Sequence, residues 1–458
     1  MKPGTLEDLY KLTPLQEEML LATTRAPNSG VYVVQSSCVL TGDLDAEAFS
    51  GAWQQVVDRH PILRTSFHWK DLEKPLQAVH RDVRLPLSRE DWRGLSAAEQ
   101  QDRFERLLQD DRRAGFQPDR VPLMRLRLIQ LNGGPDTKDE TAYRLLWTLH
   151  HLLVDGWTFG ILMKEVFLFY EAVRRGITAE LHTPPPFRDY ISWLRAQDIA
   201  AAEAFWRRRL AGLQRPPLLD ASSPPRVPAS DPAAQPVPRH CEFRSRVPRS
   251  LTADLHGFAR EHQLTLNTLV QGAWALLLSR YTGRADVVYG TIVSGRPASL
   301  SGVESMVGPF INLVPVRAVL SGEDRLLPWL DALQAEQAEA REYEHTSLAR
   351  IQSWSDLPGG QPLFDTLFVF ENYPVDTTLL QIPNDGIRVH DVRVAEQWRY
   401  PLHVIAGPGE EMQLDVLYDA NRFETGTVDG MVEHLRDTLR TIVADPSQRV
   451  ADLVTPSE

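Results

Sequence analysis

Cysteine is almost missing from this chain, whose 458 residues include only Cys38 and Cys241. Two thiols so far apart form no CxxC pair and cannot build a multi-thiolate metal site, so we expect a reducing, cytoplasmic location rather than a disulfide-stapled scaffold. The chain also lacks any apolar run near the roughly 20 residues that a membrane-spanning helix needs. Residues 1–20 carry acidic side chains and no apolar signal core, so we expect no membrane partner.

Positive charge is in short supply as well, because 49 Lys and Arg face 61 Asp and Glu, for a formal net charge of -12. General repulsion of a phosphate backbone argues against nucleic-acid binding, and we exclude it as the function. The chain does have a globular composition, with 43% hydrophobic residues, 11 Trp and 16 Phe. Its length exceeds what one compact core usually holds, which predicts two lobes.

Helical and strand patterns alternate along both halves of the sequence. Thr13, Pro14 and Gln16 suit the cap, first position and capping box of a helix that extends to about residue 24. The predicted strands are 31–40, 63–69, 143–149, 286–293 and 364–372. The further predicted helices include 45–59, 250–262, 265–281 and 427–444. Residues 214–240 are rich in Pro, Ser, Ala and Asp and predict an exposed connection. This alternation favours an α/β fold with two sandwich lobes.

The sequence HHLLVDG at 150–156 lies in a strand-to-helix loop. The preceding run 143–149 is apolar on both alternating faces, as in a strand covered on both sides, and an amphipathic helix follows Gly156. Adjacent histidines on a strand point to opposite faces, and no further His or Cys lies nearby at ligand spacing, so we expect no metal. A His pair taken alone is more often structural than catalytic, so its surroundings matter.

The run HHLLVDG resembles the HHxxxDG motif of nonribosomal peptide synthetase condensation domains, which belong to the chloramphenicol acetyltransferase superfamily. Further matches follow in the family's order: LTPLQEEM at 12–19, RHxxLRTxF at 59–67, YISW at 190–193, GTIVSGRP at 290–297 with VGPFIN at 307–312, YEHTSLxxIQ at 343–352 and YPL at 400–402. The resemblance implies two chloramphenicol-acetyltransferase-like α/β lobes, 1–175 carrying HHxxxDG and 176–458, arranged as a V with a central tunnel.

The same resemblance implies amide formation between a donor thioester and the amine of an acceptor. Both substrates would arrive on the phosphopantetheine arms of peptidyl carrier proteins, with an adenylation domain as neighbour and no cofactor bound by the domain itself. The product would belong to an antibiotic or siderophore pathway.

His151 is the predicted catalytic residue. A neutral imidazole can accept the proton that the attacking amine loses, or hold that amine in attack geometry, and the sequence leaves both roles open. Gly156 would let the backbone approach substrate and would open a helix whose N–H groups face developing negative charge. His150 is expected to be a packed, hydrogen-bonded histidine.

Other residues take their expected roles from the resemblance. Asp155 would pair with Arg64 and so hold the loop that presents His151, because an unpaired buried charge is costly. Ser294, Asn312 and Trp398 would line the tunnel. The sequence from Asp8 to residue 35 resembles the subclass whose donor ends in a D-residue.

Two alternatives share the fold. One is an acyltransferase that uses coenzyme A thioesters, and the other is a noncatalytic recruitment domain. The match at 343–352 and the segment around Asn312 favour carrier-bound substrates over coenzyme A. An intact His151 argues against recruitment alone. Heterocyclisation is disfavoured because both histidines are present, and epimerisation because the run after Gly156 differs.

Overall fold

The computed structural model describes residues 6–134, 141–214, 219, 239–359, 361–371, 386–397 and 399–454. Contacts divide the chain into two compact units. The first comprises Met1–Gln197, Arg296–Ile311 and Tyr373–Arg399, and the second comprises Asp198–Gly295, Asn312–Asn372 and Tyr400–Glu458. Each unit therefore gathers segments that are far apart in the sequence. The lobe boundary after residue 175 stays a prediction.

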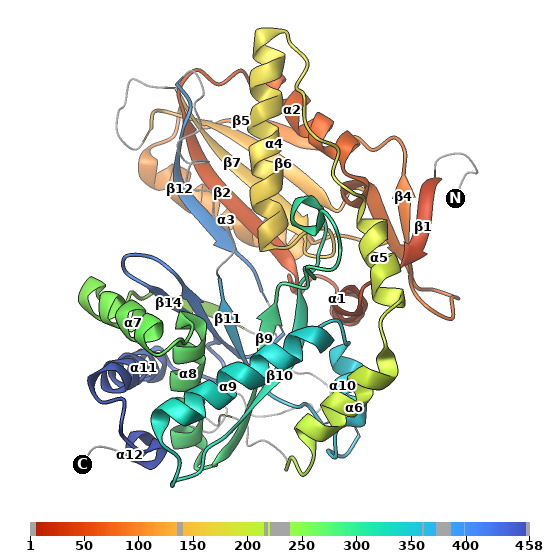
Figure 1. Ribbon diagram of the computed structural model, residues 1–458. Coiled ribbons are helices and arrows are strands. Elements are labelled where there is room, and N and C mark those ends of the chain that lie inside the picture. Colours follow the sequence, from red (N-terminus) through yellow and green to blue (C-terminus); the bar gives the residue numbers. More distant parts are fainter. Residues whose placement is uncertain are drawn as a thin grey trace, which may run out of the picture. The chain divides into compact units, whose positions relative to one another are not determined.

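A five-stranded sheet runs through the first unit in the order β12-β2-β7-β6-β5 (Figure 1). The strands are Val33–Thr41 (β2), Leu87–Asp91 (β5), Met124–Leu131 (β6), Ala142–His150 (β7) and Arg388–Ala395 (β12). Neighbours are antiparallel except β5 and β6, which are parallel. β7, which ends at His150, is the central strand. A smaller sheet has the order β1-β4-β3, formed by Leu6–Lys11 (β1), Leu76–His80 (β4) and Thr65–His68 (β3).

The helices of this unit are Pro14–Arg25 (α1), Ala46–Arg59 (α2), Ala97–Ala114 (α3), Gly156–Arg175 (α4) and Phe187–Arg195 (α5). On one face of β7, Trp147 contacts Trp53 of α2 and Phe159 of α4, with ring centroids 4.9 Å apart in both pairs. Leu146 points the other way, into a core that includes Phe104 of α3. Successive strand residues alternate in this manner. β7 is therefore covered on both sides, as its apolar sequence predicts.

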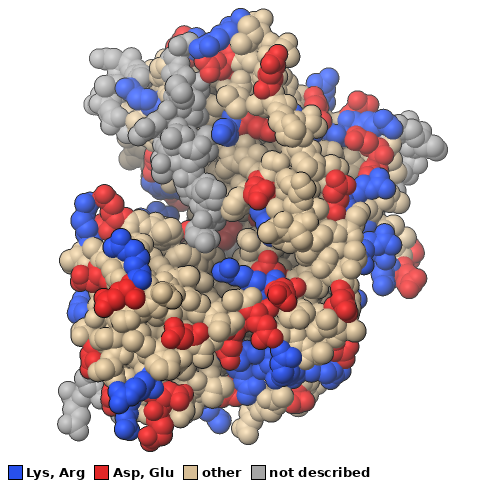
Figure 2. All heavy atoms as spheres, in the orientation of Figure 1, with Lys and Arg blue, Asp and Glu red and all other residues tan. Residues whose placement is uncertain are grey.

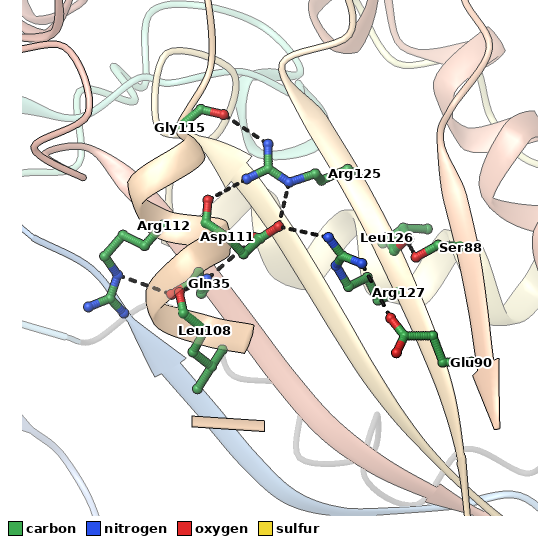
Figure 3. Close-up of polar contacts among 10 residues, drawn as sticks. All are labelled: Gln35, Ser88, Glu90, Leu108, Asp111, Arg112, Gly115, Arg125, Leu126 and Arg127. Atoms are coloured by element: carbon green, nitrogen blue, oxygen red, sulfur yellow. Dashed lines mark hydrogen bonds and ion pairs between the residues drawn. The ribbon is translucent and has the colours of Figure 1, made fainter. Parts of the chain in front are cut away.

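A buried carboxylate fastens α3 to the sheet (Figure 3). The side chain of Asp111 is only 2% exposed, and Arg125 of β6 donates a hydrogen bond to it at 2.7 Å. Arg127 lies 3.6 Å from the same carboxylate and 3.3 Å from Glu90 of β5. Gln35 of β2 donates to Asp111 at 3.4 Å. These contacts tie α3 to β6 and β2, and Arg127 extends the network to Glu90 of β5, so together they stiffen the sheet that carries His150.

The second unit has a six-stranded sheet in the order β10-β9-β11-β13-β14-β8. Its strands are His240–Phe243 (β8), Asp286–Val293 (β9), Asn312–Val319 (β10), Thr366–Phe370 (β11), Leu402–Gly407 (β13) and Gln413–Asp419 (β14). Its helices are Ile199–Leu210 (α6), Arg249–Glu261 (α7), Leu266–Thr282 (α8), Leu326–Ala340 (α9), Leu348–Trp354 (α10), Thr425–Ala444 (α11) and Val450–Val454 (α12). α8 is buried on nearly all sides and forms the centre of this unit's core.

Both units combine helices with sheets, so the predicted α/β class is confirmed. The capping box also forms: the Thr13 hydroxyl accepts from the Gln16 N–H at 3.1 Å, and the Gln16 side chain accepts from the Thr13 N–H at 2.9 Å. The predicted strand at 63–69 is shorter, because Pro61–Arg64 form a 3-10 helix before β3. Proline suits that first helical position, since its φ is fixed. Most of the predicted connection at 214–240 lies outside the described residues.

Charged side chains of both signs lie side by side on the face shown in Figure 2. The scattered charges of the sequence therefore do not merge there into one basic surface. Within the described ranges, no helix is both long and apolar enough to cross a membrane.

Candidate active site

His151 follows the last residue of β7 and opens a short loop before α4. Its backbone N–H donates to the carbonyl of Tyr32 at 2.8 Å, which fixes the loop against the residue just before β2. The His151 side chain is 7% exposed, and its Nε2 lies 3.6 Å from Oε2 of Glu396. Glu396 directly follows β12 and belongs to the same unit. The loop thus presents an imidazole that is largely enclosed and close to a carboxylate.

His150 is fully buried and hydrogen-bonded on both ring nitrogens. Its Nδ1 accepts from the Leu152 N–H at 3.1 Å, so the ring proton belongs on Nε2, which lies 2.9 Å from the Thr23 hydroxyl. That hydroxyl donates to the Met19 carbonyl at 2.8 Å. Burial, with a smaller contribution from neighbouring His151, lowers the pKa of His150 to about 3. The geometry thus describes a neutral residue that anchors the end of β7 to α1.

This burial predicts that the protein loses stability as the pH falls below neutrality. An unfolded chain protonates His150 near pH 6.5, whereas the folded chain does so only near pH 3, where its pKa lies. Between these values the unfolded state binds more protons, so the free energy of unfolding falls as the pH is lowered. We expect this residue to account for about 2 kcal/mol between pH 6.5 and pH 5.

The measurement is the melting temperature (Tm) from pH 7.5 to pH 5 for the wild type and His150→Asn. The amide oxygen of Asn can still accept from the Leu152 N–H. The melting temperature of the His150→Asn variant should depend less on pH than that of the wild type. Replacement of the exposed His256 by Asn provides the matched control. A pH dependence that His150→Asn leaves unchanged would contradict the assignment.

Asp155 is the N-cap of α4 and is completely buried. Its Oδ1 accepts from the Thr158 N–H at 2.8 Å, and its Oδ2 accepts from the Phe310 N–H at 2.8 Å. Arg296 Nη2 lies 3.6 Å from Oδ1, and the two side chains are 4% and 0% exposed. The Arg296 guanidinium also lies over the Phe310 ring, 4.0 Å from its centroid. Asp155 thus holds the start of α4 and the segment around Phe310 together within the first unit.

The prediction that Arg64 forms an ion pair with Asp155 is wrong. Arg64 Nη1 instead lies 2.7 Å from the Glu7 carboxylate of β1. Its Nε donates to the Val57 carbonyl at 3.1 Å, and its Nη1 also donates to the His80 carbonyl at the end of β4. The reason is local: Arg64 ends the 3-10 helix that leads into β3, so its side chain reaches the small sheet. Its supporting role there is to fasten β1 and β4.

Gly156 is the first residue of α4 and is exposed. The first-turn N–H of Thr158 is satisfied by Asp155, which orients the helix terminus. Groups at such a terminus favour negative charge. Gly156 therefore places an exposed residue without a side chain at this helix terminus.

Ser294 and Asn312 lie in the second unit and differ in their surroundings. Ser294 directly follows β9 and is exposed. Asn312 begins β10 and is buried, and its amide nitrogen donates to the carbonyls of Glu344 and Thr346 at 2.7 and 2.8 Å. Asn312 thus ties the start of a strand to the turn before α10. Trp398 lies outside the described residues.

Two residues of this site received no role from the sequence. Arg296 stands in the matched run GTIVSGRP, yet nothing in the spacing connects it with Asp155. Glu396 precedes the matched YPL run, and only the pairing of β12 with β2 brings it near His151. Among the described residues, no group of three or more His, Cys, Asp or Glu side chains is placed to hold a metal ion.

Comparison with known protein families shows which family the chain belongs to. The family described as Condensation domain matches residues 6–458. The chain belongs to the condensation domain family. Condensation domains of nonribosomal peptide synthetases form peptide bonds between substrates that carrier domains present on phosphopantetheine arms, so the resemblance carried by HHxxxDG is confirmed at the level of the family.

This condensation domain is 43% identical over 448 residues to one of the linear gramicidin synthase proteins of Brevibacillus parabrevis, covering 98% of the chain and 8% of that protein. It therefore spans less than a tenth of the length of this curated relative. Among solved structures, it resembles a four-domain nonribosomal peptide synthetase bound to AMP and glycine, with a TM-score of 0.82 and 18% identity over 98% of this chain and 34% of that one. It also resembles the X-domain from teicoplanin biosynthesis, with a TM-score of 0.78 and 23% identity. That match covers 99% of this chain and 98% of the X-domain chain. At these identities the two structures show the fold alone, and the chloramphenicol-acetyltransferase-like fold class is confirmed.

Proposed function

We propose that this condensation domain joins a donor acyl or peptidyl thioester to the amine of an acceptor aminoacyl thioester, with His151 at the reacting centre. The observation that carries the proposal is the anchored, largely enclosed His151 at the end of the central strand, with Nε2 3.6 Å from a carboxylate. The proposed partners are donor and acceptor peptidyl carrier proteins and a neighbouring adenylation domain, in an antibiotic or siderophore pathway.

The chemistry requires a base or a positioning group for the amine. As the amine nitrogen attacks the thioester carbon, it loses a proton and negative charge gathers on the carbonyl oxygen. A neutral imidazole at His151 can accept that proton or hold the amine by a hydrogen bond. Orientation alone can supply much of the rate, because it converts a bimolecular step into an intramolecular one.

The surrounding residues would support this step in distinct ways. Asp155 fixes the start of α4 through the Thr158 N–H, and Gly156 leaves that terminus open to the developing oxyanion. Ser294 is a stronger candidate than Asn312 for touching substrate. Ser294 is exposed, whereas the amide nitrogen of Asn312 already donates to two backbone carbonyls.

We further propose that the donor ends in a D-residue. The segment that carries the subclass resemblance includes Gly30 and Tyr32, and the Tyr32 carbonyl accepts from the His151 N–H at 2.8 Å. Both residues have positive φ, 78° and 61°, so this segment has an unusual backbone path next to the catalytic loop. A side chain on Gly30 would meet Arg112 at 2.7 Å. A segment whose backbone path and surrounding space are this constrained can favour one configuration at the reacting carbon of the donor.

The test offers matched donor peptides on a carrier protein that differ only in the configuration of a chiral terminal residue. An acceptor on a second carrier protein is added, and products are followed by intact-mass analysis. We expect the D-donor to react at least about tenfold faster, or roughly 1.4 kcal/mol between transition states. Equal rates or an L preference would remove the subclass proposal and leave condensation standing. No product from either donor would contradict condensation itself.

A further inference from the structure

Glu396 is placed beside His151 by a segment that returns from far along the chain. β12 pairs with β2 up to the Ala395–Gln35 register, and β2 in turn pairs with β7. Glu396 is the next residue after β12. Its carboxylate Oε2 lies 3.6 Å from His151 Nε2, with the two side chains 28% and 7% exposed. Figure 1 shows β12 lying along the edge of this sheet, next to β2.

The backbone on both sides of this contact is tightly held through Tyr32. The Tyr32 N–H donates to the Gln397 carbonyl at 2.8 Å, and the Tyr32 carbonyl accepts from the His151 N–H at 2.8 Å. Tyr32 is buried and has a φ of 61°, which is rare for a bulky side chain. Such a conformation persists only where its surroundings over-determine it. His151 and Gln397, the residue after Glu396, are thus both hydrogen-bonded to Tyr32.

Two guanidinium groups of this region contact other side chains. Arg399 lies 3.4 Å from the Glu18 carboxylate, and Arg112 donates to the Gln35 side chain at 3.0 Å. The separation of Glu396 from His151 is longer than a direct hydrogen bond of about 2.7–3.2 Å. The Glu396 carboxylate and the ring nitrogen Nε2 of His151 therefore face each other at a distance that leaves them without a direct hydrogen bond. A group with several N–H donors and a positive charge fits that arrangement, because charge-assisted hydrogen bonds are the stronger ones.

We propose that Glu396 binds the α-ammonium group of the acceptor substrate next to His151 Nε2, an inference that rests on the proposed function. An α-amine with a pKa of about 7.7–8.0 is largely protonated at neutral pH, and an ammonium cannot attack a carbonyl. Glu396 attracts this cation and positions one of its N–H bonds toward the imidazole. The carboxylate then stabilises the imidazolium that forms.

Atoms and electrons balance along this route. One N–H bond of the ammonium breaks, the proton goes to Nε2, and the electron pair stays on nitrogen. That pair forms the C–N bond to the donor carbonyl, while the C–S bond breaks and its electron pair leaves with sulfur. The second proton lost by nitrogen ends on the thiolate, and His151 returns its proton to solvent.

The experiment compares two carrier-bound acceptors that differ only at the nucleophile. One has an α-amino group, and the other has an α-aminooxy group, which is uncharged at neutral pH. We expect Glu396→Gln to lower kcat/KM at least about tenfold for the amino acceptor, mainly through KM, and less than about threefold for the aminooxy acceptor. Glu396→Asp keeps the charge and should retain at least about a third of the wild-type value for the amino acceptor.

A surface exchange of the same kind, Glu410→Gln, serves as the control, because Glu410 is exposed and pairs with Arg249. Equal losses for both acceptors in Glu396→Gln would overturn the role of Glu396, and so would unchanged rates for both. An unstable Glu396→Gln protein leaves the Asp variant to decide, since a loss there as large as that of Glu396→Ala would also overturn it. A wild type that turns over neither acceptor overturns the proposed function itself.

Discussion

His151→Ala is expected to lower the rate of amide formation by at least about a hundredfold, the loss typical of a missing acid-base group. The substitution removes the imidazole beside Glu396 while the backbone N–H of residue 151 can still donate to Tyr32. The fold should therefore survive, and binding of carrier proteins should be unchanged. Intact-mass analysis of loaded carrier proteins gives the rate, and the melting temperature confirms that the variant is folded.

The exposed His256 again provides a matched control, since His256→Ala should leave the rate unchanged. The size of the effect also separates the two roles of His151. A loss that is severe for weakly nucleophilic acceptors and mild for reactive ones would favour positioning over proton transfer. Near-normal turnover with every acceptor would contradict the assignment of His151.

Asp155→Asn is expected to lower the free energy of unfolding of the protein. The side chain of Arg296 is 4% exposed, and its charge would remain buried without the carboxylate that now lies 3.6 Å away. Breaking a buried pair in this way costs about 3–5 kcal/mol. The new amide nitrogen would also face a backbone N–H, either that of Thr158 or that of Phe310. We expect a fall in melting temperature of about 10 °C, with a lower yield of folded protein.

A double-mutant cycle tests which arginine is the partner. Asp155→Asn and Arg296→Met should be strongly non-additive in the free energy of unfolding, because the two side chains share one buried contact. Asp155→Asn and Arg64→Ala should be nearly additive, since Arg64 pairs with Glu7. Coupling of Asp155 with Arg64 in place of Arg296 would contradict this pairing.

Much of the local structure could be predicted from short-range patterns. The capping residues Thr13 and Gln16, the proline that opens α1 and the apolar strand before His150 all depend on neighbours within a few positions. Such signals are read directly from the chain, because helix caps and strand alternation are local properties. The loop position of His151, between a buried strand and a helix, follows from the same signals.

The partners of the site residues could not be predicted in this way. Arg64 and Arg296 are both arginines in matched motifs, and the family resemblance favoured the wrong one for Asp155. The choice depends on where the two chain segments lie: Arg64 ends a 3-10 helix beside β1 and β4, whereas Arg296 lies with Phe310 against the start of α4. Separations of more than a hundred residues carry no periodic signal.

By itself, the sequence determined the α/β class, the strand-to-helix loop and His151 as the residue of interest, because each follows from local patterning or from an ordered set of motifs. Only the tertiary structure decided that Asp155 pairs with Arg296 and that Glu396 lies beside His151. The physical reason is that β12 joins β2 across some 350 residues of chain, since Arg388 pairs with Thr41. Hydrogen bonds between distant strands, and not any pattern along the chain, bring that carboxylate to the imidazole.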